Sequence, residues 1–182
     1  MTPDDDAETR TTPGARTPSR RYMARRDAII ASAIREMNQH GVRGMTLGEV
    51  AARLDLVPTG VIYYFRNKED LAAAAYERSI GRIRELAEAA AVHLSERERV
   101  AAFVRLFIDL RQRIELGEAE PLAVFNDVRA LNCESVNTAY VGMFRDVRAL
   151  LDRKATRSRA DLNGRTHLLL NALTFVTAWI YT

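Results

Sequence analysis

The sequence predicts an all-α protein, and three observations support this prediction. Ala, Leu, Arg and Glu dominate the composition, whereas the 182 residues include only five Pro and nine Gly. Apolar residues recur at helical spacing along most of the chain, and no segment shows the sustained alternation of a β-strand. With 47% hydrophobic residues, the chain can bury the core of one or two small domains. We expect about eight helices.

The first 19 residues are rich in Thr, Pro, Asp and Arg and have no apolar period, so we expect a disordered arm. The arm also lacks the apolar segment of a secretory signal peptide. A single cysteine, Cys133, excludes an intramolecular disulfide framework and a cysteine-rich zinc site. These features favour a cytoplasmic protein.

The first helix is expected from Tyr22 to His40. Its apolar residues recur at helical spacing and are Met23, Ile29, Ile30, Ala33, Ile34 and Met37. Gly41 and Gly44 follow, as is typical of a helix C-terminus.

Two short helices are predicted next. Thr46 and Glu49 have the spacing of a capping box, in which the hydroxyl and the carboxylate each bind a free backbone N–H. The helix that this box opens can run only to about Arg53. Pro58 suits the first turn of the second short helix. That helix must end before Asn67, which caps a much longer one.

Four longer helices and a short one, over 121–131, are expected in the rest of the chain. We expect them over 68–93, from a Ser95 capping box to Gly117, over 121–131, over 134–154, and from residue 160 to the end. Residues 168–182 are apolar on more than one face, but they are too few to span a bilayer and are interrupted by polar residues. We expect a core and interface helix here, and a natural chain that continues beyond Thr182.

Positive charge is concentrated in the N-terminal third. Residues 20–68 carry nine Arg or Lys against four Asp or Glu, a net charge of +5, whereas the whole chain carries +3. A basic segment followed by a near-neutral body fits a polyanion-binding head. Charge alone fits a solvated, Arg-rich helical surface equally well.

The two short helices have the pattern of a helix-turn-helix that spans about Thr46 to Phe65. Ala51 is the small residue expected where the two helices meet, and Asp55 occupies the turn, where left-handed backbone must be tolerated. The apolar positions around them are Val50, Leu54, Leu56, Val61 and Tyr64.

The second short helix carries groups suited to DNA. The hydroxyls of Thr59 and Tyr64 can donate to phosphates, and Thr can also contact base edges. Gly60 lets the backbone approach a groove closely. Thr46 and Lys68 each lie at a helix N-terminus, where free N–H groups favour a phosphate.

The N-terminal part resembles the DNA-binding domain of TetR-family regulators. The resemblance extends from Arg26 to Leu71, and its most specific part is the phrase Tyr-Phe-Arg-Asn-Lys-Glu-Asp-Leu at 64–71. It implies a homodimer, without a cofactor, whose recognition helices enter major grooves of a palindromic operator in double-stranded DNA. It also implies DNA contacts by five residues, namely Thr46, Thr59, Gly60, Tyr64 and Lys68.

Two residues depart from the family pattern. Ile62 stands where the family has Tyr, three residues before Phe65, so we expect Tyr63 to make this phosphate contact instead. Val57 replaces the usual Ser or Thr cap, so the recognition helix lacks a capping side chain.

The resemblance divides the chain into a helix-turn-helix DNA-binding domain at 20–77 and a helical effector-binding and dimerisation domain at 78–182. The second domain should hold a pocket for a small molecule. Its expected lining is apolar with a few polar groups, and comprises Phe103, Phe107, Phe125, Met143, Phe144, His167, Asn171 and Phe175. Each Phe or Met also fits a simple core role. We expect neither a catalytic nor a metal site, because no residues with suitable chemistry have the required spacing.

The sequence therefore predicts a ligand-responsive transcriptional regulator, most simply a repressor that a small-molecule effector releases from its operator. Two alternatives remain. The first is a helical enzyme or effector-binding module whose helix-turn-helix contacts protein, which the basic head argues against. The second is an activator in place of a repressor.

Overall fold

The computed structural model describes residues 19–125, 128, 131–152 and 156–179, with side chains up to residue 174. Over these residues the chain forms seven α-helices and no strand, which confirms the all-α prediction. The helices are α1 (Arg20–Gly44), α2 (Leu47–Ala52), α3 (Pro58–Ile62), α4 (Lys68–Ala91), α5 (Glu96–Glu115), α6 (Glu134–Leu151) and α7 (Arg159–Trp179). The expected arm at 1–19 lies outside the described residues, apart from Ser19.

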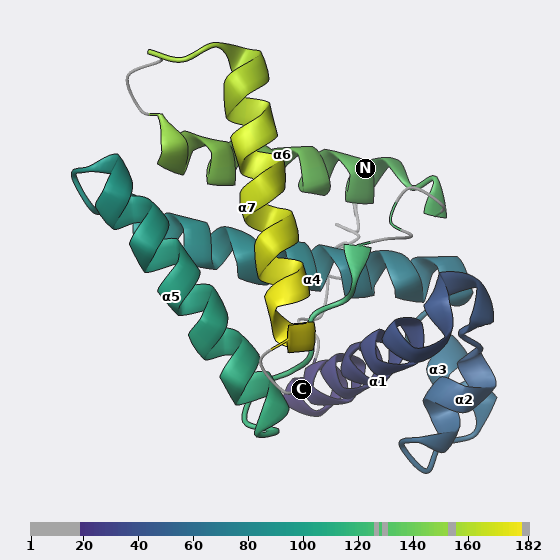
Figure 1. Ribbon diagram of the computed structural model, residues 1–182. Coiled ribbons are helices and arrows are strands. Elements are labelled where there is room, and N and C mark those ends of the chain that lie inside the picture. The colour runs from purple at the N-terminus through teal and green to yellow at the C-terminus, as the bar shows by residue number, and fades with distance from the viewer. Residues whose placement is uncertain (1–18, 126–127, 129–130, 153–155, 180–182) are drawn as a thin grey trace, which may run out of the picture.

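Helix α4 is the central element, because it packs against α1, α5 and α6, while α7 packs on α5 and α6. Figure 1 shows α2 and α3 at one end of the molecule, near the start of α4, and α5 running back from the other end. The predicted domain boundary at residue 77 lies inside α4, which passes through it without a break. The division into two domains stays a prediction.

Helix α1 forms where the apolar period predicted it. The Ser19 hydroxyl caps it by accepting from the Tyr22 N–H at 3.2 Å, and Ile29, Ile30 and Ile34 are buried on one face. The backbone leaves helical geometry at Gly41, with φ of 70°, and one further turn leads to Gly44. The glycine is suited to this position because left-handed backbone strains residues that have a Cβ atom.

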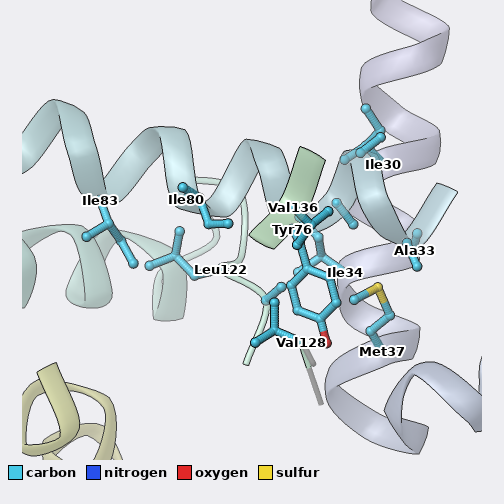
Figure 2. Close-up of a cluster of buried hydrophobic side chains, with 14 of the residues drawn as sticks. Ile30, Ala33, Ile34, Met37, Tyr76, Ile80, Ile83, Leu122, Val128 and Val136 are labelled. Atoms are coloured by element: carbon cyan, nitrogen blue, oxygen red, sulfur yellow. The ribbon is translucent and has the colours of Figure 1, made fainter. Parts of the chain in front are cut away.

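One hydrophobic core joins the two predicted domains. Figure 2 shows side chains of α1, including Ile34 and Met37, close to Tyr76 of α4, with Val128 and Val136 beside them. Tyr76 is 1% exposed. Helix α1 is thus packed directly against the helical body.

The short helix predicted over 121–131 is wrong in its described part. Residues 121–124 are not helical, and Phe125, Val128 and Leu131 belong to 3₁₀ turns. The reason lies in the backbone partners: Asn38 bonds the carbonyl of Leu122 and the N–H of Val124, each at 2.9 Å. The Ser79 hydroxyl accepts from the Ala123 N–H at 2.9 Å. Side chains from distant helices therefore take the groups that a helix would pair internally.

The remaining helices start within one residue of their predicted positions, and α4, α5 and α6 end somewhat earlier than predicted. Both arms of the capping box at Ser95 are present, and Gly117, with φ of 75°, follows the end of α5 as predicted. Helix α6 ends at Leu151, and residues 153–154 of its predicted extent lie outside the described residues. No described helix is long and apolar enough to cross a membrane.

Candidate nucleic-acid interface

The first helix of the predicted helix-turn-helix begins at Thr46. The Thr46 hydroxyl accepts from the Glu49 N–H at 3.2 Å and donates to the Glu49 carboxylate at 2.8 Å. The hydrogen bond that the Thr46 hydroxyl accepts in the predicted capping box is therefore present. The Glu49 carboxylate accepts from this hydroxyl. Thr46 is exposed, so its oxygen remains open to solvent beside the helix N-terminus.

Helix α2 is held on α1 by a buried charge. The Glu36 side chain is 3% exposed and forms an ion pair with Arg53, the C-cap residue of α2. Arg53 also donates to the Gln39 side chain at 2.6 Å. The Ser32 hydroxyl adds a hydrogen bond to the carbonyl of Val50 at 3.2 Å. These contacts could not be predicted from local sequence patterns, because the partners are far apart in the chain.

The turn between α2 and α3 has the predicted left-handed residue. Asp55 has a φ of 54°. The Leu56 N–H bonds the carbonyl of Ala51 at 3.0 Å, and the Asp55 N–H bonds that of Ala52 at 3.2 Å. This pair of bonds is a Schellman motif, which ends a helix and turns the chain sharply.

Helix α3 is short and presents one face to solvent. Val61 is fully buried, whereas Thr59, Ile62 and Tyr63, spaced along one face, are exposed. Val57 provides no capping side chain, which confirms the prediction, and Pro58 begins the first turn. Tyr63 is 73% exposed. It can therefore reach a phosphate, as we expect of the residue that replaces the missing family Tyr.

Tyr22 joins this surface, which the sequence analysis did not predict. Its ring lies 4.7 Å from that of Tyr64 and 6.0 Å from that of Tyr63 in an edge contact, measured between centroids. The rings of Tyr63 and Tyr64, which directly follow α3, have centroids 5.0 Å apart. The first turn of α1 therefore packs against the end of α3 and positions both phenol groups.

Lys68 begins α4, as predicted, and is tied to α1. Its ammonium donates to the carbonyl of Arg43 at 3.0 Å, while Asn67 caps the helix by accepting from the Asp70 N–H at 2.7 Å. Arg26 lies over the ring of Phe65, 5.0 Å from its centroid.

Of the six residues predicted to contact DNA, Thr46, Thr59 and Tyr63 are exposed, and Gly60, Tyr64 and Lys68 are half-buried.

The body contains cavities next to several predicted pocket residues. Phe107 and Phe125 line two adjoining cavities of about 90 and 120 Å³, and the larger of the two also touches Met143 and Asn171. A more open hollow of about 320 Å³ contacts Phe144 and His167. The predicted residues are therefore divided between separate cavities.

Two predicted pocket residues lie elsewhere. Phe103 is fully buried in the core, with its ring 6.4 Å from that of Phe107, and lines none of these three cavities. The Phe175 side chain lies outside the described residues. Among the described side chains, no group of three or more His, Cys, Asp or Glu could hold a metal ion.

Comparison with known proteins agrees with this geometry. Residues 29–75 match the profile of the family described as bacterial regulatory proteins, tetR family. The chain is 32% identical over 83 residues to the HTH-type transcriptional regulator BetI of Rhizobium meliloti, a match that covers 45% of this chain and 41% of BetI.

Solved structures share the whole fold. The fatty acid degradation regulator FadR of Bacillus halodurans superposes with a TM-score of 0.66 at 16% identity, over 87% of each chain. FadR of Bacillus subtilis, solved in complex with stearoyl-CoA, gives a TM-score of 0.58 at 16% identity, over 85% of this chain and 87% of that one.

The exposed α3 lies within the matched residues, so this part of the chain is similar to the bacterial regulatory proteins of the tetR family.

Proposed function

We propose that the protein binds operator DNA by inserting α3 into a major groove, and that a small molecule in the body lowers this affinity. The observation that carries the first part is the exposed face of α3, with Thr59 and Tyr63 opposite the buried Val61. Thr can read base edges and Tyr can donate to phosphates.

Charge supports DNA as the partner. Arg20, Arg21, Arg25, Arg43 and Arg66 are exposed on the elements around α3. Basic side chains around a groove-reading helix neutralise phosphates, and this releases counterions. A protein-binding helix-turn-helix has no need of this charge.

A homodimer is part of the proposal. One short recognition helix reads only half of a site, and two-fold symmetric dimers read palindromes. Large apolar side chains are exposed on the body, among them Val141 of α6 at 67% and Leu168 of α7 at 72%. Exposed apolar groups of this kind are suited to a subunit interface.

The ligand-responsive part is supported by the cavities in the body and by the neighbour solved with stearoyl-CoA. The protein would exist in two states, of which one binds DNA and the other does not. A ligand that binds one state more tightly shifts the population towards that state. Release of a repressor is the simplest form of such a switch.

The proposal is tested by selecting fragments from random double-stranded DNA with the purified protein. We expect a palindromic sequence to be enriched and its affinity to fall steeply as salt is raised. Failure to enrich any sequence would contradict the proposal. Enrichment of a site with no two-fold symmetry would contradict the homodimer alone.

A further inference from the structure

The two adjoining cavities of the body share walls; the smaller is mainly apolar, whereas Tyr140 and Asn171 add polar groups to the larger. Ile83, Phe107, Phe125 and Thr174 line both of them. Each volume, about 90 and 120 Å³, exceeds the ~30 Å³ share of one water molecule. Such a space suits the apolar part of a small ligand.

Arg111 of α5 lines the smaller cavity, and its side chain is 24% exposed. Its Nε atom is buried and has no partner among the described residues. Its Nη2 atom has only a distant contact with the Glu115 carboxylate, at 3.6 Å, and that carboxylate is 48% exposed. An unpaired buried donor is unfavourable, and a charged one especially so.

We propose that these cavities bind a small apolar carboxylic acid whose carboxylate pairs with the Arg111 guanidinium. This inference rests on the proposed function, since it names the chemical class of the effector. A carboxylate matches the planar guanidinium and provides the missing acceptors. The alkyl part of the acid would lie against Ile83, Phe107 and Phe125.

The positive charge of Arg111 favours a ligand that carries a single negative charge. Arg111 is the one charged residue among the described side chains that line either cavity. A cationic ligand would be repelled, and a ligand without an acceptor would leave the buried Nε donor unpaired. A phosphate dianion would bury a second charge without a partner, which is costly in an apolar site.

The position of the site explains how the acid would act on the head. Leu122 and Val124 line the same cavity as Arg111, and both are bonded through their backbone to Asn38 of α1. A ligand that moves this segment would therefore act on the helix that carries α2.

The experiment is calorimetric titration of the full chain with straight-chain carboxylates from butanoate to dodecanoate, below their critical micelle concentrations. The matched amides and alcohols serve as uncharged probes. We expect at least one acid to bind at least ~10-fold more tightly than its amide. The variant Arg111→Met should reduce that affinity by at least ~10-fold, as loss of a charge-assisted hydrogen bond does.

Three further variants refine the test. Arg113→Met removes an exposed charge two residues along α5 and should leave acid binding unchanged. Arg111→Lys keeps the charge and should restore part of the affinity that Arg111→Met loses. Glu115→Gln removes the competing carboxylate and should tighten binding by about 2-fold. Circular dichroism verifies that each variant is folded.

Several results would overturn the inference: no acid of the series binds, acid and amide bind equally, or folded Arg111→Met binds the acid as the parent does. Operator affinity measured with and without the acid tests the proposed function separately. Binding through Arg111 without a change in operator affinity would retain the site and contradict ligand-induced release.

Discussion

A Cβ atom at Gly60 would meet its nearest heavy atoms, on Leu56, at 3.9 and 4.0 Å. This is ordinary contact, so the protein itself has room for alanine at this position. The absence of a side chain is thus better explained by the approach of α3 to DNA than by packing.

Gly60→Ala should therefore separate folding from function. We expect the free energy of unfolding to stay constant or to rise by up to ~1 kcal/mol, because alanine favours helix. DNA affinity should fall at least ~10-fold as the methyl group obstructs the groove. Urea denaturation and fluorescence anisotropy measure the two effects.

Gly81→Ala is the matched control, because a Cβ atom there meets nothing within 4 Å and the residue lies on α4. It should keep full DNA affinity. If Gly60→Ala binds DNA as tightly as Gly81→Ala, close approach at Gly60 is not required.

Asp55 can be tested in the same way, since its φ of 54° lies in the left-handed region. Asp55→Gly should raise the free energy of unfolding by roughly 0.5–1 kcal/mol, and Asp55→Ala should lower it, because glycine adopts this geometry without strain. Thermal denaturation of the two variants gives the sign of each. Equal effects of both would show that the turn is not strained.

At the scale of elements, α2 depends on the ion pair between Glu36 and Arg53. The variant Arg53→Met leaves the buried Glu36 carboxylate without its main partner and should lower the free energy of unfolding by about 2–3 kcal/mol. This is below the range for fully buried pairs because the Arg53 side chain is 38% exposed.

The exposed Arg35 of α1 provides the control, since Arg35→Met removes the same charge at the surface and should change stability little. Adding Glu36→Gln to Arg53→Met should recover part of the loss. If Arg53→Met is no less stable than Arg35→Met, the ion pair does not hold α2.

Local signals predicted these elements well. Thr46, Pro58 and Asn67 fixed the starts of α2, α3 and α4, because caps act within one turn of the chain. The segment at 121–124 was mispredicted because its partners, Asn38 and Ser79, lie far away in sequence. No pattern of neighbouring residues carries that information.

At the scale of the molecule, head and body are joined by polar contacts as well as by the core. Arg78 of α4 forms ion pairs with Asp27 of α1 and with Glu120, which precedes the segment at 121–124. Burial alone would lower the pKa of Arg78, but the hydrogen bonds and charges of the two carboxylates outweigh it and raise that pKa. The Arg78 guanidinium therefore stays charged at any physiological pH.

Asn38 is the most direct test of this connection. Asn38→Ala removes both the donor to the Leu122 carbonyl and the acceptor of the Val124 N–H, and should lower the free energy of unfolding by about 1–2 kcal/mol. Amide exchange at Val124 should accelerate, while DNA affinity should change by less than ~3-fold because Asn38 is not on the proposed DNA-binding surface. Gln112→Ala, at an exposed position of α5, is the control. Unchanged exchange at Val124 would contradict the role of Asn38.

The sequence could predict where the proposed DNA-binding surface lies, but little of the proposed ligand site. Thr59 and Lys68 were expected on that surface because the helix-turn-helix is a local pattern, and their contacts with DNA stay predictions. Tyr22 was missed because it reaches α3 only through the tertiary fold. Arg111 was missed because its unpaired donor is visible only when its surroundings are known.

The measurement that tests the central claim most directly is the affinity of the purified protein for the selected operator against a scrambled fragment of equal length. Anisotropy titrations at physiological salt are suitable. Recognition through α3 predicts a preference of at least ~10³-fold for the operator. Equal affinity for the two fragments would contradict sequence recognition by this helix-turn-helix.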